Sequence, residues 1–132
     1  MNLKRALVIV VLLSAVVFTG GVVVEHAAEP GASETVLGIN PEAPGLVVAA
    51  IMLSILLAVA IALRPTSLVL AIAGAFGLIF AFVDTLEILH QMQERRPSIA
   101  AIAAIAALFH LAIPVLAIVL MRRPPARQPL AS

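Results

Sequence analysis

Several residue types are missing or scarce in this 132-residue chain. It has no cysteine, which excludes disulfide bonds, zinc–thiolate sites, iron–sulfur clusters and cysteine catalysis. It has no tryptophan or tyrosine, so the aromatic belts that usually mark membrane interfaces are missing, and no basic stripe with stacking aromatics predicts a nucleic-acid partner. Charged residues make up only 11% and hydrophobic residues 63%, against about 25% and about 45–50% in typical globular chains. A chain this apolar cannot cover its core with polar surface in water, so its solvent is expected to be lipid.

The hydrophobic residues are grouped into four long stretches, which predict helices over about 6–27, 44–63, 67–92 and 98–121. The third reaches the length of a membrane span only if it continues through the polar segment 84–92. Short turns at 64–67 and 94–98 join antiparallel neighbours. Thr66 or Ser67 is expected to cap the third helix and Ser98 the fourth. The predicted fold is therefore all-α: one integral membrane domain, 1–132, forming an antiparallel bundle of four transmembrane helices.

The distribution of basic residues predicts the orientation. Six of them belong to one side of the expected bundle: Lys4, Arg5, Arg64, Arg122, Arg123 and Arg127. The other side has two, Arg95 and Arg96. The basic side is expected to be cytoplasmic, with Met1, Ser132 and the tail 122–132. The loop 28–45 is expected to be external, in a multi-pass protein of the cell (inner) membrane.

The first segment also resembles a signal peptide, because Lys4 and Arg5 precede an apolar run. The segment His26-Ala27-Ala28 is a poor cleavage site, since His26 takes a position that needs a small residue. We therefore interpret the first segment as a retained helix.

Asp84 is the least expected residue of the third helix, because a charge at the centre of a membrane costs about 2.5–3.5 kcal/mol on insertion scales. It belongs to a stripe with alternating spacings of three and four residues, which is typical of a packed helix seam: Gly77, Phe80, Asp84, Glu87 and Gln91. We expect Asp84 to face the bundle interior and to have a polar neighbour from another helix.

His110 of the fourth helix is the expected inner partner in a proton relay with Asp84. Pro114 has no N–H, so the His110 carbonyl loses its helical donor and a bend is predicted there. Folding the hairpin places His110 about 7–8 Å deeper than Asp84 at 1.5 Å rise per residue, so shared water is one way to join them. Ser14 and Ser54 are alternative partners, and a buried packing histidine is the structural alternative.

A second set of candidate ligands is expected near the external surface: Glu25, His26, Glu87 and His90. Mixed imidazole and carboxylate ligands suit a divalent transition metal such as zinc, manganese, iron or copper. The structural alternatives are an intrahelical pair of Glu87 with His90 at the wetted helix end, and a solvated His26.

The segment 82–91, with Glu25-His26 and the loop segment 37–42, resembles small uncharacterised four-helix membrane proteins of actinobacterial type. The resemblance implies this fold and no activity.

The lipid bilayer is an expected partner of this protein. Two hypotheses about its function follow. The first is a non-enzymatic subunit of a larger membrane complex or a homo-oligomer, favoured by the small residues Gly20, Gly21, Gly74 and Gly77 and by the alanine face of the fourth helix. The second is metal binding or proton relay at the Asp/Glu/His cluster. An enzyme is disfavoured, because a P-loop, a Rossmann glycine pattern and an H-E-x-x-H motif are absent.

Overall fold

The computed structural model describes residues 2–28 and 43–122, which form α1 (Leu3–Ala28), α2 (Pro44–Leu63), α3 (Ser67–Gln93) and α4 (Pro97–Met121). All four helices are long and apolar enough to cross a membrane. The predicted all-α four-helix bundle is confirmed, and its four apolar helices are compatible with a small multi-pass membrane protein. The expected external loop and most of the expected tail lie outside the described residues.

The helix ends follow from local chemistry. Thr66 caps α3: its hydroxyl accepts a hydrogen bond from the Val69 N–H at 3.3 Å. The prediction that Ser98 caps α4 is wrong, because α4 begins one residue earlier, at Pro97, with Arg96 in the capping position. Proline fits the first helical position, since its φ is already helical and its missing N–H would have had no partner there.

The turn between α3 and α4 is tight and has one left-handed residue. Arg95 has φ of 60°, and the N–H of Arg96 donates to the Gln91 carbonyl at 2.8 Å. This is the hydrogen bond of a Schellman motif, in which the left-handed position is usually glycine. The turn reverses the chain within a few residues, so α3 and α4 pack side by side along their lengths.

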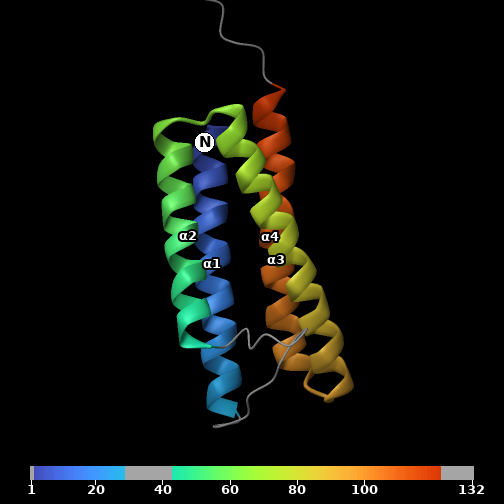
Figure 1. Ribbon diagram of the computed structural model, residues 1–132. Coiled ribbons are helices and arrows are strands. Elements are labelled where there is room, and N and C mark those ends of the chain that lie inside the picture. Colours follow the sequence, from blue (N-terminus) through green and yellow to red (C-terminus); the bar gives the residue numbers. More distant parts are fainter. Residues whose placement is uncertain (1, 29–42, 123–132) are drawn as a thin grey trace, which may run out of the picture.

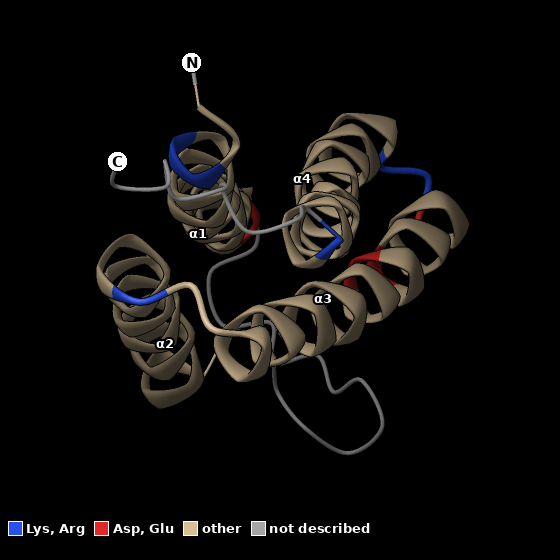
Figure 2. Cartoon of the chain, turned by 90° about the horizontal axis from the view of Figure 1, so that it is seen from above, with Lys and Arg blue, Asp and Glu red and all other residues tan. Residues whose placement is uncertain are grey.

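The helices run alternately up and down, as Figure 1 shows. Helix α4 packs along α3 and also against α1, and α1 packs against α2. Helix α3 is tilted: it begins beside α2 and moves away from it toward its end (Figure 2). The backbones of α1 and α3 do not approach each other, since these helices lie at opposite corners of the bundle.

The two ends of the bundle differ in chemistry. At the basic end, where α1 and α3 begin, Lys4 Nζ donates to the Ala62 carbonyl at 3.0 Å and ties α1 to the last turn of α2. An apolar cluster fills the interior near this end: Leu7, Val11, Leu57, Ala58, Ile61, Leu70, Ala73, Phe76, Ile113 and Ala117. At the acidic end, where α1 and α3 end and α4 begins, the interior holds carboxylates.

Candidate functional site

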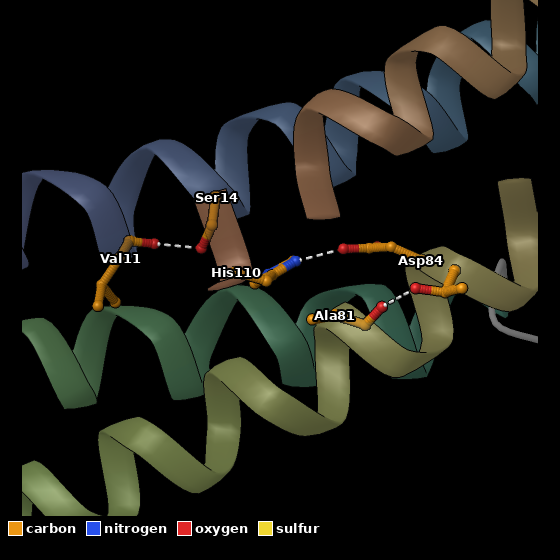
Figure 3. Close-up of polar contacts among 6 residues, drawn as sticks. Val11, Ser14, Ala81, Asp84 and His110 are labelled. Atoms are coloured by element: carbon orange, nitrogen blue, oxygen red, sulfur yellow. Dashed lines mark hydrogen bonds and ion pairs between the residues drawn. The ribbon is translucent and has the colours of Figure 1, made fainter. Parts of the chain in front are cut away.

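A buried ion pair or hydrogen bond joins α3 to α4 inside the bundle. Asp84 is 4% exposed and His110 is 1% exposed, and Asp84 Oδ2 lies 2.6 Å from His110 Nδ1. Figure 3 shows the two side chains pointing at each other. The structure thus places Asp84 against a polar group of another helix, and the contact is direct rather than through water.

The direction of helical side chains explains why these residues meet although the predicted depths of their backbones differ. A side chain in an α-helix leans toward the N-terminus of its own helix. Helices α3 and α4 are antiparallel, so Asp84 leans toward the basic end while His110 leans toward the acidic end. The two side chains therefore approach each other along the bundle axis and close the gap between their backbones.

Gly77 brings α3 close to α4 at the same level. A Cβ atom on Gly77 would lie 2.6 Å from the His110 carbonyl oxygen and 2.7 Å from Pro114 Cδ, closer than real Cβ atoms come. Only glycine allows this approach, which sets His110 within reach of α3. The helix runs through Pro114 without a break. The bend expected there remains a prediction.

Aromatic rings surround the imidazole. The Phe80 ring lies 5.1 Å from the His110 ring, tilted by 35°, and the Phe76 ring lies 6.1 Å away, edge to face. Phe18 of α1 packs edge-on against Phe80 at 5.9 Å. These rings keep the Asp84–His110 contact in a medium of low polarity, where a hydrogen bond between such groups is electrostatically stronger than in water.

The serines expected as alternative partners of His110 bond within their own helices. Ser14 is buried and donates its hydroxyl to the Val11 carbonyl at 2.9 Å, as Figure 3 shows. Ser54 donates to the Ala50 carbonyl at 2.8 Å. Both hydroxyls are thereby satisfied by backbone, and Asp84 is the polar group that binds the imidazole.

Gln91 organises the acidic end, and its role was not predicted. This residue is fully buried, and its Nε2 donates to Glu87 Oε1 at 2.6 Å and also to Glu25 Oε1 of α1. One side-chain amide thus bridges α1 and α3, whose backbones are apart. Its burial could have been predicted from its position on the stripe with Asp84 and Glu87, because this stripe marks the interior side of α3.

A cavity of about 60 Å³ lies between α1, α3 and α4. Three carboxylates line it: Glu25, Asp84 and Glu87. The rest of its wall is apolar or small and includes Phe18, Gly21 and Ile102. No Lys or Arg is among the residues that line the cavity.

The structure brings together only part of the predicted metal set. Glu25 and Glu87 meet through Gln91, whereas His26 is exposed on α1 and His90 is half-buried on α3. Within residues 2–28 and 43–122, no three His, Cys, Asp or Glu side chains are grouped so that they could hold a metal ion. The geometry therefore favours the Asp84–His110 pair and the carboxylate-lined cavity over the predicted metal centre.

The small residues that had suggested a partner protein are largely used within the chain. Gly77 packs against α4, Gly74 lies in ordinary contact with Pro114, and Gly21 faces Ile102. On α4, Ala103 and Ala107 are buried. Among the four glycines Gly20, Gly21, Gly74 and Gly77, Gly20 alone has open space around its Cβ position.

The chain was compared with family models, curated proteins and solved structures, and none of them matches it.

Proposed function

We propose that this protein is a non-enzymatic membrane protein that relays protons, with Asp84 and His110 as the relay pair. One observation carries the proposal: the carboxylate and the imidazole share a 2.6 Å contact inside the bundle. In addition, Asp84 lines a cavity. A hydrogen bond of this length lets a proton pass between two atoms without either side chain moving.

The charges of the site are compatible with the uptake and release of a proton. With one proton shared between them, Asp84 and His110 have no net charge, so the pair tolerates burial. A second proton gives the pair one positive charge. The carboxylates of Glu25 and Glu87, which line the same cavity as Asp84, then lower the cost of that charge.

The basic end of the bundle favours a slow relay over an open channel. Beyond the pair, the buried side chains of the apolar cluster fill the space between the four helices. A proton on His110 therefore reaches the basic end only when water enters or the helices move apart. Alternating access of this kind is common in membrane proteins with a site near the midplane.

Proton flux into liposomes tests the relay. The purified chain is reconstituted with a pH-sensitive dye inside, and valinomycin with potassium removes the membrane potential. A pH step should be dissipated faster than in empty liposomes. In Asp84→Asn and His110→Gln the flux should fall at least about tenfold, because each variant removes a group that takes up and releases the proton.

The matched control is Glu94→Gln, which removes one carboxylate from an exposed position at the end of α3. It changes the net charge as Asp84→Asn does and leaves the buried pair intact, so its flux should equal that of the wild type. If Asp84→Asn is folded and its proton flux equals that of the wild type, the proposal is wrong.

A subunit role or a homo-oligomer is the second candidate, and the open side of the bundle favours it. Helix α2 packs mainly on α1, so the other described helices cover little of the flank between α2 and the tilted α3. Exposed apolar side chains such as Leu56 and Val59 lie on α2. The particle mass in native-lipid nanodiscs tests this role: a monomer with no co-purifying protein contradicts it.

A further inference from the structure

The cavity between α1, α3 and α4 is large enough and polar enough to hold water. A volume of about 60 Å³ holds about four to six water-sized spheres, at about 10–15 Å³ each. Water stays in a cavity where polar groups bind it, and Glu25, Asp84 and Glu87 line this one with carboxylate oxygens. The cavity is therefore suited to a short chain of water molecules.

The carboxylates of the cavity lie at different depths. Asp84 is only 4% exposed, whereas Glu25 and Glu87 are half-buried, so these two reach both the cavity and the surface of the protein. Glu87 follows Asp84 by three residues on α3. Its backbone therefore lies about 4.5 Å nearer the acidic end at 1.5 Å rise per residue. The cavity thus leads from the acidic end of the bundle to the buried relay pair.

Gln91 fixes the position of Glu87 beside the cavity. The Gln91 Nε2 donates to Glu87 Oε1 at 2.6 Å. A carboxylate has two oxygens with about four lone-pair sites, so this hydrogen bond leaves Glu87 able to take up a proton. Glu87 is therefore an ordered acid group on the surface side of the cavity, and Asp84 is an acid group on its buried side.

We propose that the cavity is the water-filled entrance of the relay, and that Glu87 takes up a proton at the acidic end and passes it to Asp84 through this water. In the transfer, one proton leaves Glu87 for a water molecule and another proton leaves the water chain for Asp84, so only O–H bonds form and break. This inference rests on the proposed function and deepens it, because it names the route by which protons reach the buried pair.

Single cysteines test the water-filled entrance without any measurement of proton flux, because the chain has no cysteine of its own. Ala103 and Ala117 are both buried on α4, but Ala103 lines the cavity and Ala117 belongs to the apolar cluster. Silver ion is no larger than a water molecule and reacts with thiolates. In lipid nanodiscs it should block Ala103→Cys at least about tenfold faster than Ala117→Cys, because apolar surroundings keep a thiol protonated.

The thiols that silver has not blocked are alkylated after denaturation and counted by mass spectrometry. The two variants are matched, since each replaces a buried alanine of the same helix. Equal rates of blocking at Ala103→Cys and Ala117→Cys would refute the water-filled entrance.

Proton flux into liposomes tests the role of Glu87. Glu87→Gln keeps an oxygen that accepts from Gln91 but cannot take up a proton, so the flux should fall at least about tenfold. Glu87→Asp keeps a carboxylate on a shorter side chain and should keep most of the flux. A purely structural role would give the opposite order, because Gln has the size of Glu and Asp does not. Flux equal to that of the wild type in a folded Glu87→Gln would overturn the assignment.

Two adjacent glycines test the route independently of Glu87. Gly21 lines the cavity, and a Cβ on it would lie 3.4 Å from a side-chain atom of Ile102, which lines the cavity too. Gly20 has open space around its Cβ position. Gly21→Leu should displace the water and lower the flux at least about tenfold, whereas Gly20→Leu should leave it unchanged. If Glu87→Gln does not fold, this pair decides, and equal flux in both glycine variants contradicts the route.

The two kinds of measurement separate this inference from the relay itself. Proton flux in the wild type together with equal silver rates at the two cysteines would leave the relay standing and refute the entrance. Fast blocking of Ala103→Cys together with no proton flux in the wild type would support the water-filled cavity and refute the relay, and with it the transfer from Glu87.

Discussion

At the scale of single residues, Asp84 and His110 depend on each other for their burial. Each is almost wholly removed from the surface, and the two come from helices joined by a short turn. Because hydrocarbon offers no hydrogen bonds, a polar side chain inside the bundle must find its partner within the protein or in trapped water. The 2.6 Å contact meets this need for both residues at once.

Substitutions at Asp84 should separate hydrogen bonding from charge. Asp84→Asn keeps an acceptor for the imidazole, so the free energy of unfolding should change by less than about 0.6 kcal/mol, the average for hydrogen bonds between membrane helices. Asp84→Leu leaves the buried His110 without its partner and should cost about 1–2 kcal/mol. Reversible unfolding in mixed detergent micelles, followed by helical circular dichroism, measures both. Equal stabilities of the Asn and Leu variants would mean that the contact contributes nothing to the fold.

At the scale of helices, the α3–α4 interface depends on one glycine. Gly77→Ala should destabilise the protein by about 1–3 kcal/mol, because its Cβ would overlap the His110 carbonyl and Pro114 and push the helices apart. Gly74→Ala is the matched control on the same face of α3. Its Cβ would lie 3.9 Å from Pro114, an ordinary contact, so the higher helix propensity of alanine should leave stability unchanged or up to about 1 kcal/mol higher. The same unfolding assay compares them, and a harmless Gly77→Ala would contradict the close packing.

The bridge between α1 and α3 is the second interface that one residue controls. Gln91→Leu removes the amide that binds Glu25 and Glu87, so α1 should separate from α3 at the acidic end. Gln93→Leu, an exposed position on the last turn of α3, is the control. Spin labels placed near the ends of α1 and α3 should give a broader distance distribution in Gln91→Leu than in Gln93→Leu. Identical distributions would show that the amide does not hold these helices together.

At the scale of the whole molecule, the orientation in the membrane remains a prediction from the basic residues. The chain has no cysteine, so single cysteines report without background. Ser67 lies at the basic end and Ser98 at the acidic end, and both are exposed. A membrane-impermeant thiol reagent added outside intact cells should label Ser98→Cys and not Ser67→Cys. The reverse labelling would show the opposite orientation, in which the cavity lies nearer the cytoplasm.

Much of the architecture was predictable because it depends on local sequence. A helix in lipid satisfies its own backbone, so apolar runs of sufficient length and the turns between them predict the four helices. The error at the start of α4 was also local: Pro97 competes with Ser98 for the first turn, and proline takes the first helical position. The stripe through Asp84 and Glu87 indicated which side of α3 faces the interior.

The sequence by itself determined the composition of the site, namely one buried acid, one histidine beside a proline and several acids toward one end. Only the tertiary structure decided which groups meet. His110 lies 26 positions from Asp84, and Gln91 lies 66 positions from Glu25. Such contacts depend on the tilt of α3, the close approach at Gly77 and the direction in which side chains lean along antiparallel helices. The pattern within one helix does not contain these quantities, because they arise from packing between helices.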